Sequence, residues 1–460
     1  MGFPIMRRFN EARRNPLPRA LTALSAVAVL TSSAVACSSS GSEGSDTTGS
    51  APVTLTVQQQ TGQETLFGYF AKAFHKAHPN VTVKLQTISQ EQKAGSNLTV
   101  LGSANAPDVG FVPVGSSPYT ALTSRGGLTD LSDVWSSGDL AKRYGSGVSG
   151  SLKVGGKPYV VAFSQAIYNV VWYNPAAFAK AGVTVPTDHR FATPEDLIAA
   201  AKKLKSAGYA PLQLGGASGY QASWMVDALL PTSASPAQLE NYLASYNSKT
   251  AVTAKYTDPA FTKVLSTLEN YRKSGVYQDG FLGQKYQDAE TPFLAGKAGM
   301  FLGGNFTAAD FVPAKTSVKP DWLLLPPVNA GTKTTQTGYY GDALGIPVRA
   351  QHKAWAKKFL EFVMSEKAQS EGVVGTANLL PGVKDLPASA FTKLDANSRS
   401  ILADIAKNGS AAGWTSVVPN ALAQTFIDPK IQAMYSGSLS PSALAQQQQD
   451  ELLSFRKSAS

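Results

Sequence analysis

The chain has 460 residues, with 41 lysines and arginines against 31 aspartates and glutamates, and a formal net charge of +10. At about 150 residues per domain, this length allows two or three domains or lobes. Hydrophobic residues make up 43% of the chain, which excludes a wholly disordered protein. The single cysteine excludes an internal disulfide framework and a multi-cysteine zinc site.

The N-terminus has the pattern of an export signal. Five arginines in residues 1–19 precede an apolar, small-residue stretch, 20–36, which is too short and too rich in Ser and Thr for a transmembrane helix. Cys37 follows Ala34-Val35-Ala36, and this resembles the lipobox of bacterial lipoproteins, although Ala34 stands where leucine is usual. The resemblance implies cleavage before Cys37 and a lipid on its sulfur. An ordinary signal peptide with an incidental cysteine is the alternative.

Removal of residues 1–36 changes the interpretation of the charge. It lowers the formal net charge from +10 to +6, and the remaining chain has no run of five or six basic residues. Nucleic-acid binding therefore has little support. Residues 37–52 are rich in Ser, Gly and Thr and form a flexible tether. An anchor followed by a tether predicts a protein held at the outer face of a membrane.

The folded body begins with alternating strands and helices. Residues 53–60 and 81–88 alternate in the manner of strands, residues 64–78 have apolar side chains at helical spacing, and a helix through Leu98 and Leu101 leads to a strand at 107–114. This β-α-β-α-β order predicts a parallel sheet with right-handed crossovers. Ligands of such sheets bind at the carboxyl ends of the strands, here residues 58–61 and 112–117.

Further elements follow along the chain without a repeat of solenoid or propeller type. Thr193, followed by Pro194 and Glu195, is a strong helix start. The other predicted elements are strands at 159–163 and 170–173, and helices from 174 to 182, 194–207, 353–365 and 442–457.

Several short motifs in a fixed order carry a resemblance to a known family. They are Ala106-Pro107-Asp108-Val109, Gly127-Leu128-Thr129-Asp130-Leu131, Gly156-Lys157-Pro158-Tyr159, Val171-Trp172-Tyr173-Asn174, Thr193-Pro194-Glu195-Asp196-Leu197, Phe293 with Gly296, Lys297 and Met300, Leu325-Pro326, and Trp355 with Phe359, Leu360 and Phe362. Together they resemble a family 1 extracellular solute-binding protein, the carbohydrate-binding lipoprotein of a bacterial ABC importer of actinobacterial type. The resemblance covers nearly all of residues 53–455.

The resemblance implies an α/β, two-lobed, periplasmic-binding-protein-like fold of type II. Each lobe is a mixed, mostly parallel sheet flanked by helices, with a ligand cleft between the lobes and hinge closure around the ligand. The implied N-terminal lobe is 53–162 plus 327–375, and the C-terminal lobe is 163–325 plus 377–460. Crossovers are expected near Phe163-Ser164, Leu325–Pro327 and Thr376–Leu379.

The family also implies partners and a location. The expected partners are a mono- or oligosaccharide, the membrane permease subunits with a separate ATPase chain, and the membrane itself through the lipid anchor. The protein is expected to be a monomer at the extracellular face of the cell membrane, without a cofactor, a metal or a bound nucleic acid.

A sugar offers an apolar face and a belt of hydroxyl groups, so its site needs aromatic platforms together with amides and carboxylates. Trp224 matches in position a family aromatic that stacks on sugar, and Tyr220 lies one turn before it. Phe306 stands where the family often has Trp, and Asn305 precedes it. The alternative for Trp224 is a core position in an amphipathic helix.

Other candidate sugar-binding residues come from loops and strand ends. They are Gln58, Gln59, Gln60 and Glu64 after the first strand, Tyr339, Tyr340 and Asp342 in a polar loop, Asn378 beside a predicted crossover, and Trp414. For the three glutamines, a solvated strand end is the alternative. Residues 110–115, directly after Pro107-Asp108-Val109, contain no acidic group where the family often has an aromatic or an aspartate. The maltose-type carboxylate arrangement therefore has no match at this position, and the identity of the sugar stays open.

An enzyme is the less favoured interpretation. A glycosidase needs two carboxylates about 5–10 Å apart across a cleft, but Asp130 with Asp133 and Glu195 with Asp196 stand in turns or helix starts. The four histidines show no metal-binding spacing, and no nucleophile-elbow or Walker motif is present. A peptide- or polyamine-binding importer component or a surface adhesin remains as a third class. Polyamines require several carboxylates, so aromatics and amides favour sugar.

Overall fold

The computed structural model describes residues 48–89, 92, 96–114, 117–144, 152–311, 315–339, 342–418 and 422–459. The chain divides into two units, Met1–Ser45 and Asp46–Ser460, and every described residue belongs to the second. The predicted signal 1–36, Cys37 and all of the tether before residue 48 lie outside the described residues. Among the residues that are described, no helix has the length and apolar character needed to cross a membrane.

The first sheet contains the strands predicted at the start of the folded body. β1 (Val53–Gln60) is parallel to β2 (Val81–Ile88), and a bridge from Val57 to Val109 sets it parallel to the chain that enters β3 (Gly110–Pro113). A later strand, β13 (Asp342–Gly345), is antiparallel to both β3 and β6 (Val160–Ala162). The β-α-β-α-β start is confirmed, and the complete sheet is mixed.

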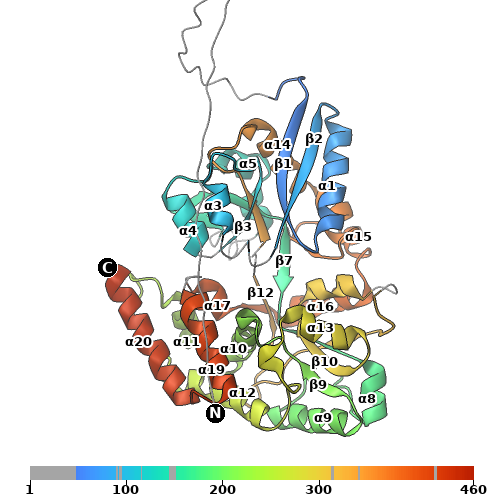
Figure 1. The fold of residues 1–460 in the computed structure, drawn as a ribbon, viewed down its shortest axis with the longest axis vertical. Helices are drawn as coiled ribbons and strands as arrows, with labels where there is room; N and C mark the ends of the chain where they lie inside the picture. The colour runs from blue at the N-terminus through green and yellow to red at the C-terminus, as the bar shows by residue number, and fades with distance from the viewer. Residues whose placement is uncertain are drawn as a thin grey trace, which may run out of the picture. The chain divides into compact units, whose positions relative to one another are not determined.

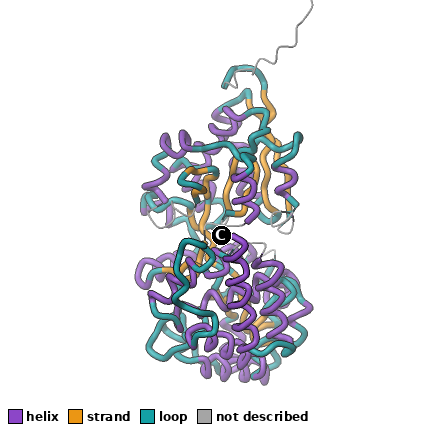
Figure 2. The backbone as a smooth tube through the Cα atoms, turned by 90° about the vertical axis from the view of Figure 1, so that its left-hand side faces the viewer, coloured by secondary structure: helices purple, strands orange, loops and turns teal. Residues whose placement is uncertain are grey.

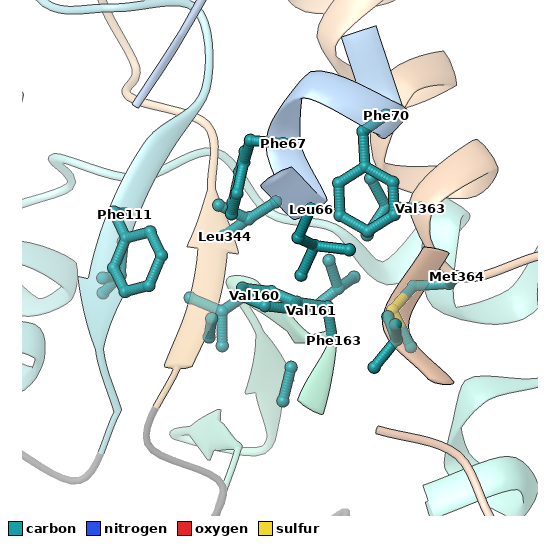
Figure 3. Packing of buried hydrophobic residues seen from close by; sticks show 14 of the residues in the cluster. Leu66, Phe67, Phe70, Phe111, Val160, Val161, Phe163, Leu344, Val363 and Met364 are labelled. Atoms are coloured by element: carbon teal, nitrogen blue, oxygen red, sulfur yellow. The ribbon is translucent and has the colours of Figure 1, made fainter. Parts of the chain in front are cut away.

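The helix between β1 and β2 covers this sheet with its apolar face. α1 (Glu64–Ala77) buries Leu66, Phe67, Phe70 and Phe74, which the helical period places on one side. The Phe67 ring meets Phe70 and Phe163 edge to face at 5.6 Å each, and Figure 3 shows this packing. Around the same sheet lie α3 (Asn97–Leu101), α4 (Ser117–Ser124), α5 (Ser132–Ser137), α6 (Leu140–Tyr144), the hairpin of β4 (Lys153–Val154) and β5 (Lys157–Pro158), α14 (Lys353–Val363) and the π-helix η3 (Ala368–Val374).

The second sheet has the order β11-β8-β10-β9. β10 (Ala298–Gly303) is parallel to β9 (Ala210–Gln213) and antiparallel to β8 (Val170–Tyr173), which is antiparallel to β11 (Asp321–Leu323). Helices surround it (Figure 2). They are α8 (Pro175–Ala181), α9 (Pro194–Ser206), α10 (Gly219–Ser233), α11 (Pro236–Ala244), α12 (Pro259–Lys273), η1 (Phe281–Gly283), α13 (Tyr286–Leu294), η2 (Asn305–Asp310), α17 (Trp414–Val417), η4 (Ala423–Ile427), α19 (Asp428–Ser436) and α20 (Pro441–Ala459).

Local sequence signals set the starts of two of these helices. Thr193 and Asp196 form a capping box at α9, in which each side chain accepts from the other's backbone N–H. The Asn174 side chain accepts from two backbone N–H groups at the start of α8. The predicted helix starts at 174 and 193 are confirmed.

A third sheet, β14-β7-β12-β15, joins the other two. β7 (Ser164–Ile167) follows β6 of the first sheet and precedes β8 of the second, while β12 (Gln336–Tyr339) follows β11 of the second and precedes β13 of the first (Figure 1). The remaining strands are β14 (Leu380–Pro381) and β15 (Ser410–Ala412), with α15 (Ala388–Phe391) and α16 (Ala396–Asn408) between them. We call this the crossing sheet.

The strands of the crossing sheet can be compared with the three predicted crossovers between the lobes. β7 begins at Ser164, where the first crossover was expected, and β14 directly follows the third expected crossover, Thr376–Leu379. Residues 328–332, just after the expected middle crossover at Leu325–Pro327, still hydrogen-bond to the end of α10, and β12 then leads on to β13. The exact lobe boundaries stay a prediction.

Candidate functional site

Five aromatic side chains gather where the crossing sheet meets the second sheet. We call Tyr168, Tyr220, Trp224, Tyr286 and Phe306 the aromatic cluster. The Trp224 ring lies 5.2 Å from Tyr220, 5.3 Å from Tyr168, 6.3 Å from Phe306 and 6.4 Å from Tyr286 between ring centroids. The predicted residues Tyr220, Trp224 and Phe306 are thus brought together.

Secondary structure fixes the positions of these rings. Tyr220 and Trp224 are four residues apart in α10 and therefore share one face of the helix. Phe306 is in η2, which follows the end of β10, and Tyr168 directly follows β7. Tyr168 and Tyr286 are buried, Trp224 and Phe306 are partly exposed, and Tyr220 is 36% exposed. The buried rings support the partly exposed ones, which can present an apolar face to a ligand.

Asn305 places an amide beside these rings. Its Oδ1 accepts a hydrogen bond from the backbone N–H of Ile167 in β7 at 2.8 Å, and the residue is 1% exposed. The Nδ2 group has no hydrogen-bond partner among the described residues. Because the bond to Ile167 fixes which way the amide faces, Nδ2 is a buried hydrogen-bond donor with a fixed direction.

A buried polar network lies behind Trp224. Asp227 is one turn further along α10 and accepts hydrogen bonds from Tyr168 Oη at 3.0 Å, from the Thr415 backbone N–H at 2.8 Å and from the Thr415 hydroxyl. Burial raises the pKa of Asp227 to about 7, although these donors oppose the rise. Burial also raises the pKa of nearby Asp428, which accepts from Ser223, to about 6.

A second group of charged side chains lies near Tyr286, at one edge of the aromatic cluster. Burial of Glu290, followed by the charge of Asp310, raises the Glu290 pKa to about 8. Lys315 forms an ion pair with Asp310. That bond raises the pKa of Lys315, and the charges of Glu290 and Glu64 add to the rise. Glu64 is at the start of α1, where its carboxylate accepts a hydrogen bond from the Gly62 backbone N–H at 2.9 Å.

The three glutamines of β1 differ in their environments. Gln58 is buried and exchanges amide hydrogen bonds with Asn97 at 2.8 and 2.9 Å, while its Oε1 also accepts from the Phe111 N–H. Gln59 is buried and donates to Thr87 Oγ1 at 2.9 Å. Gln60 is only partly buried. The structure thus gives Gln58 an internal role in the first lobe, and only Gln60 and the exposed Glu64 remain accessible from this group.

Two further predicted residues have structural partners. Trp414 is 1% exposed, and its indole N–H donates to Tyr256 Oη at 2.8 Å in the core of the second sheet. Asn378 has a left-handed φ of 52° and binds Asp395, the residue that caps α16. Both side chains thus have partners in packing and capping, and their expected contact with sugar stays a prediction.

The polar loop at 339–342 falls mostly outside the description. Tyr340 lies outside the described residues, and for Tyr339 and Asp342 only the backbone is described, in β12 and β13. Their proposed contact with sugar stays a prediction.

Sequence reasoning missed Tyr168, Tyr286 and Asp227. Tyr168 and Tyr286 reach the cluster from segments far from α10 in the chain, which no local pattern signals. Asp227 did leave a signal, because it is a lone carboxylate in the otherwise apolar run Trp224–Leu230. A carboxylate in such a place is buried only with hydrogen-bond partners.

Comparison with known proteins gives the family. The profile of the bacterial extracellular solute-binding proteins matches residues 59–370, more than half of the chain. The chain belongs to this family. The predicted family and its two-lobed type II fold are confirmed.

Individual relatives are more distant. An uncharacterized ABC transporter extracellular-binding protein of Pyrococcus horikoshii is 26% identical over 340 residues, 72% of this chain and 71% of that protein. A chitin oligosaccharide binding protein has a TM-score of 0.74 at 20% identity, covering 88% of this chain and 99% of the other. The GacH receptor of Streptomyces glaucescens, solved with and without acarbose, has a TM-score of 0.68 at 20% identity, covering 88% and 99%. These structural likenesses show the fold.

The carboxylate pairs considered for catalysis have local partners. Asp130 accepts from Ser132 and pairs with Lys157, Asp133 pairs with Lys357, and Asp196 caps α9. The part of the chain that the structure describes holds no group of three or more potential metal ligands. The family is one of binding proteins, and capture of a solute is the activity to explain.

Proposed function

We propose that this solute-binding protein captures a mono- or oligosaccharide outside the membrane and delivers it to the permease of an ABC-type importer. Tyr220, Trp224, Asn305 and Phe306 form the second-lobe part of the proposed site. Gln60 and Glu64 are its proposed contribution from the first lobe. The sugar ligands named for two structural relatives support the ligand class.

One observation carries this proposal. Partly exposed aromatic rings stand beside a buried amide whose Nδ2 has no partner among the described residues. Aromatic faces match the apolar face of a sugar, and an oriented amide donor matches its hydroxyl groups. A polyamine would require several unpaired carboxylates here, whereas Asp227, Asp428 and Asp310 bind Tyr168, Thr415, Ser223 or Lys315.

The first prediction concerns the two partly exposed rings. A thermal-shift screen of xylo-, cello-, malto- and chito-oligosaccharides identifies a ligand by the stabilisation that it produces. Trp224→Ala and Phe306→Ala should then each weaken calorimetric affinity for that ligand by about ten- to hundredfold, because a stacked ring contributes roughly 1–3 kcal/mol. The melting temperature of each ligand-free variant should stay close to that of the wild-type protein.

Tyr209→Ala is the matched control, because Tyr209 is a partly exposed aromatic that contacts Lys180 outside the cluster. It should leave affinity unchanged. If no sugar stabilises the protein, or if Trp224→Ala lowers melting but keeps full affinity, the proposed sugar site is wrong.

The second prediction concerns the anchor. We propose that Cys37 carries a lipid after cleavage of residues 1–36 and holds a monomeric protein at the extracellular face of the cell membrane. Cys37→Ser should move the protein from the membrane fraction to the medium without changing its sugar affinity. Membrane association that persists in this variant would contradict the lipoprotein assignment, and immunoblots of the two fractions measure it.

A further inference from the structure

We propose that Asp227 is a positioning residue, which holds Tyr168 and thereby fixes the Trp224 ring on which the ligand stacks. The inference rests on the proposed function for its ligand, but its geometry is a property of the ligand-free protein. It adds to the site a side chain that is only 1% exposed.

Three donors converge on the Asp227 carboxylate. Tyr168 Oη and the Thr415 hydroxyl both donate to Oδ2, and the Thr415 backbone N–H donates to Oδ1. No Lys or Arg pairs with Asp227 among the described residues. An apolar side chain would fill this position in a helix interior at lower desolvation cost. We therefore explain the carboxylate at this position by the two residues that it holds in place, Tyr168 and Thr415.

Tyr168 connects this carboxylate to the platform. Its ring lies 5.3 Å from the Trp224 ring at an interplanar angle of 38°. Tyr168 directly follows β7, and its backbone N–H donates to the Thr337 carbonyl of β12 at 3.0 Å. Tyr168 is therefore fixed at both ends: its backbone bonds to the crossing sheet, and its hydroxyl bonds to Asp227 in α10.

The same network reaches the segment after β15. Thr415 is the second residue of α17, and its two hydrogen bonds fasten this helix to α10 behind Trp224. The platform, the crossing sheet and α17 thus meet at one carboxylate. Releasing Tyr168 from Asp227 should loosen the Trp224 ring even where the fold is kept.

The chain offers a matched pair of tyrosines for the test. The Tyr168 and Trp224 ring centroids are 5.3 Å apart, and so are those of Tyr256 and Trp414. Tyr256 Oη accepts a hydrogen bond from the indole N–H of Trp414. The protein is labelled with 5-fluorotryptophan, and the resonance lost in Trp224→Phe assigns Trp224 among the six tryptophans. Tyr168→Phe removes only the hydroxyl and should shift or broaden the Trp224 resonance. Tyr256→Phe should affect Trp414 and leave Trp224 unchanged.

Asp227→Asn is the second variant, because it keeps the shape of the side chain but cannot accept all three donors as a carboxylate does. It should affect the Trp224 resonance in the same way. If Trp224 keeps its position and width in both Tyr168→Phe and Asp227→Asn, Asp227 does not position it and the inference is overturned. This readout needs no ligand.

Measurements of sugar affinity distinguish a failure of this inference from a failure of the proposed function. Tyr168→Phe should weaken affinity for the sugar found by thermal shift by about two- to tenfold, the range of one ordinary hydrogen bond. Tyr256→Phe should keep affinity even if its melting temperature falls equally. If wild-type protein binds no sugar, the proposed function fails while the fluorine spectra still decide the positioning role. If sugar binds wild type and Tyr168→Phe equally, the positioning role in binding is wrong.

Discussion

At the scale of single residues, the close approach of Gly413 to Tyr168 is the tightest constraint beside the cluster. A Cβ atom on Gly413 would lie 1.5 Å from Tyr168 Oη and 2.9 Å from Asp227 Oδ2. The backbone at Gly413 has φ −75° and ψ 135°, a conformation that alanine adopts readily. Only the lack of space therefore requires glycine here.

Gly413→Ala should accordingly displace the Tyr168 hydroxyl from Asp227. We expect a loss of about 1–3 kcal/mol in the free energy of unfolding, the usual cost of overpacking, and a weaker affinity for the sugar. Calorimetric melting and titration measure the two effects.

Gly68→Ala is the control, because Gly68 lies within α1 and a Cβ there meets nothing within 4 Å. Alanine should stabilise this helix by about 0.5–1 kcal/mol and leave sugar affinity unchanged. A Gly413→Ala protein with the melting temperature and affinity of wild type would show that the Tyr168 hydroxyl has room to move.

The residues of the site also show what sequence can predict. Trp224 and Phe306 were found from aromatic type and position, and the structure places their rings together. Trp414 and Gln58 have the same residue types as good sugar contacts, but their polar atoms bind Tyr256 and Asn97. Residue type gives the capacity to bind, whereas only the fold decides whether a side chain is already occupied.

At the scale of elements, α10 combines the platform with its support. Tyr220, Trp224 and Asp227 recur at spacings of four and three residues, so they follow one side of the helix. Tyr220 is at the exposed end of this row and Asp227 at the buried end. The helical period therefore sets the position of the carboxylate behind the ring, and no loop needs to be ordered for it.

Elements with strong local signals were predicted well, and the crossing sheet was not. β1, α1, β2 and the start of α9 follow from alternation, helical spacing and a capping box. β14 has two residues and β15 has three, and each pairs with a strand that is distant in sequence. Such strands are defined by their partners and leave no period in their own residues.

At the scale of the whole molecule, three carboxyl groups of the second lobe, two of them buried and one partly buried, have raised pKa values. Burial is the largest cause for Asp227, Asp428 and Glu290, whose pKa values rise to about 7, about 6 and about 8. In the unfolded chain, such groups lose their protons near pH 4. Between about pH 4 and pH 8 the folded protein therefore holds protons that the unfolded chain has released.

The sign of the resulting pH dependence follows from this difference. Stability falls as pH rises wherever the folded state binds more protons, by at most about 1.4 kcal/mol per pH unit for each group. The melting temperature of the ligand-free protein should therefore be higher near pH 5 than near pH 8. Asp227→Asn should reduce this slope, because its amide does not titrate. Asp133→Asn, at the exposed pair with Lys357, is the control and should keep the wild-type slope. A melting temperature that stays constant or rises between these two pH values would show that the three groups are ionised in the folded protein, and calorimetric scans across this range measure it.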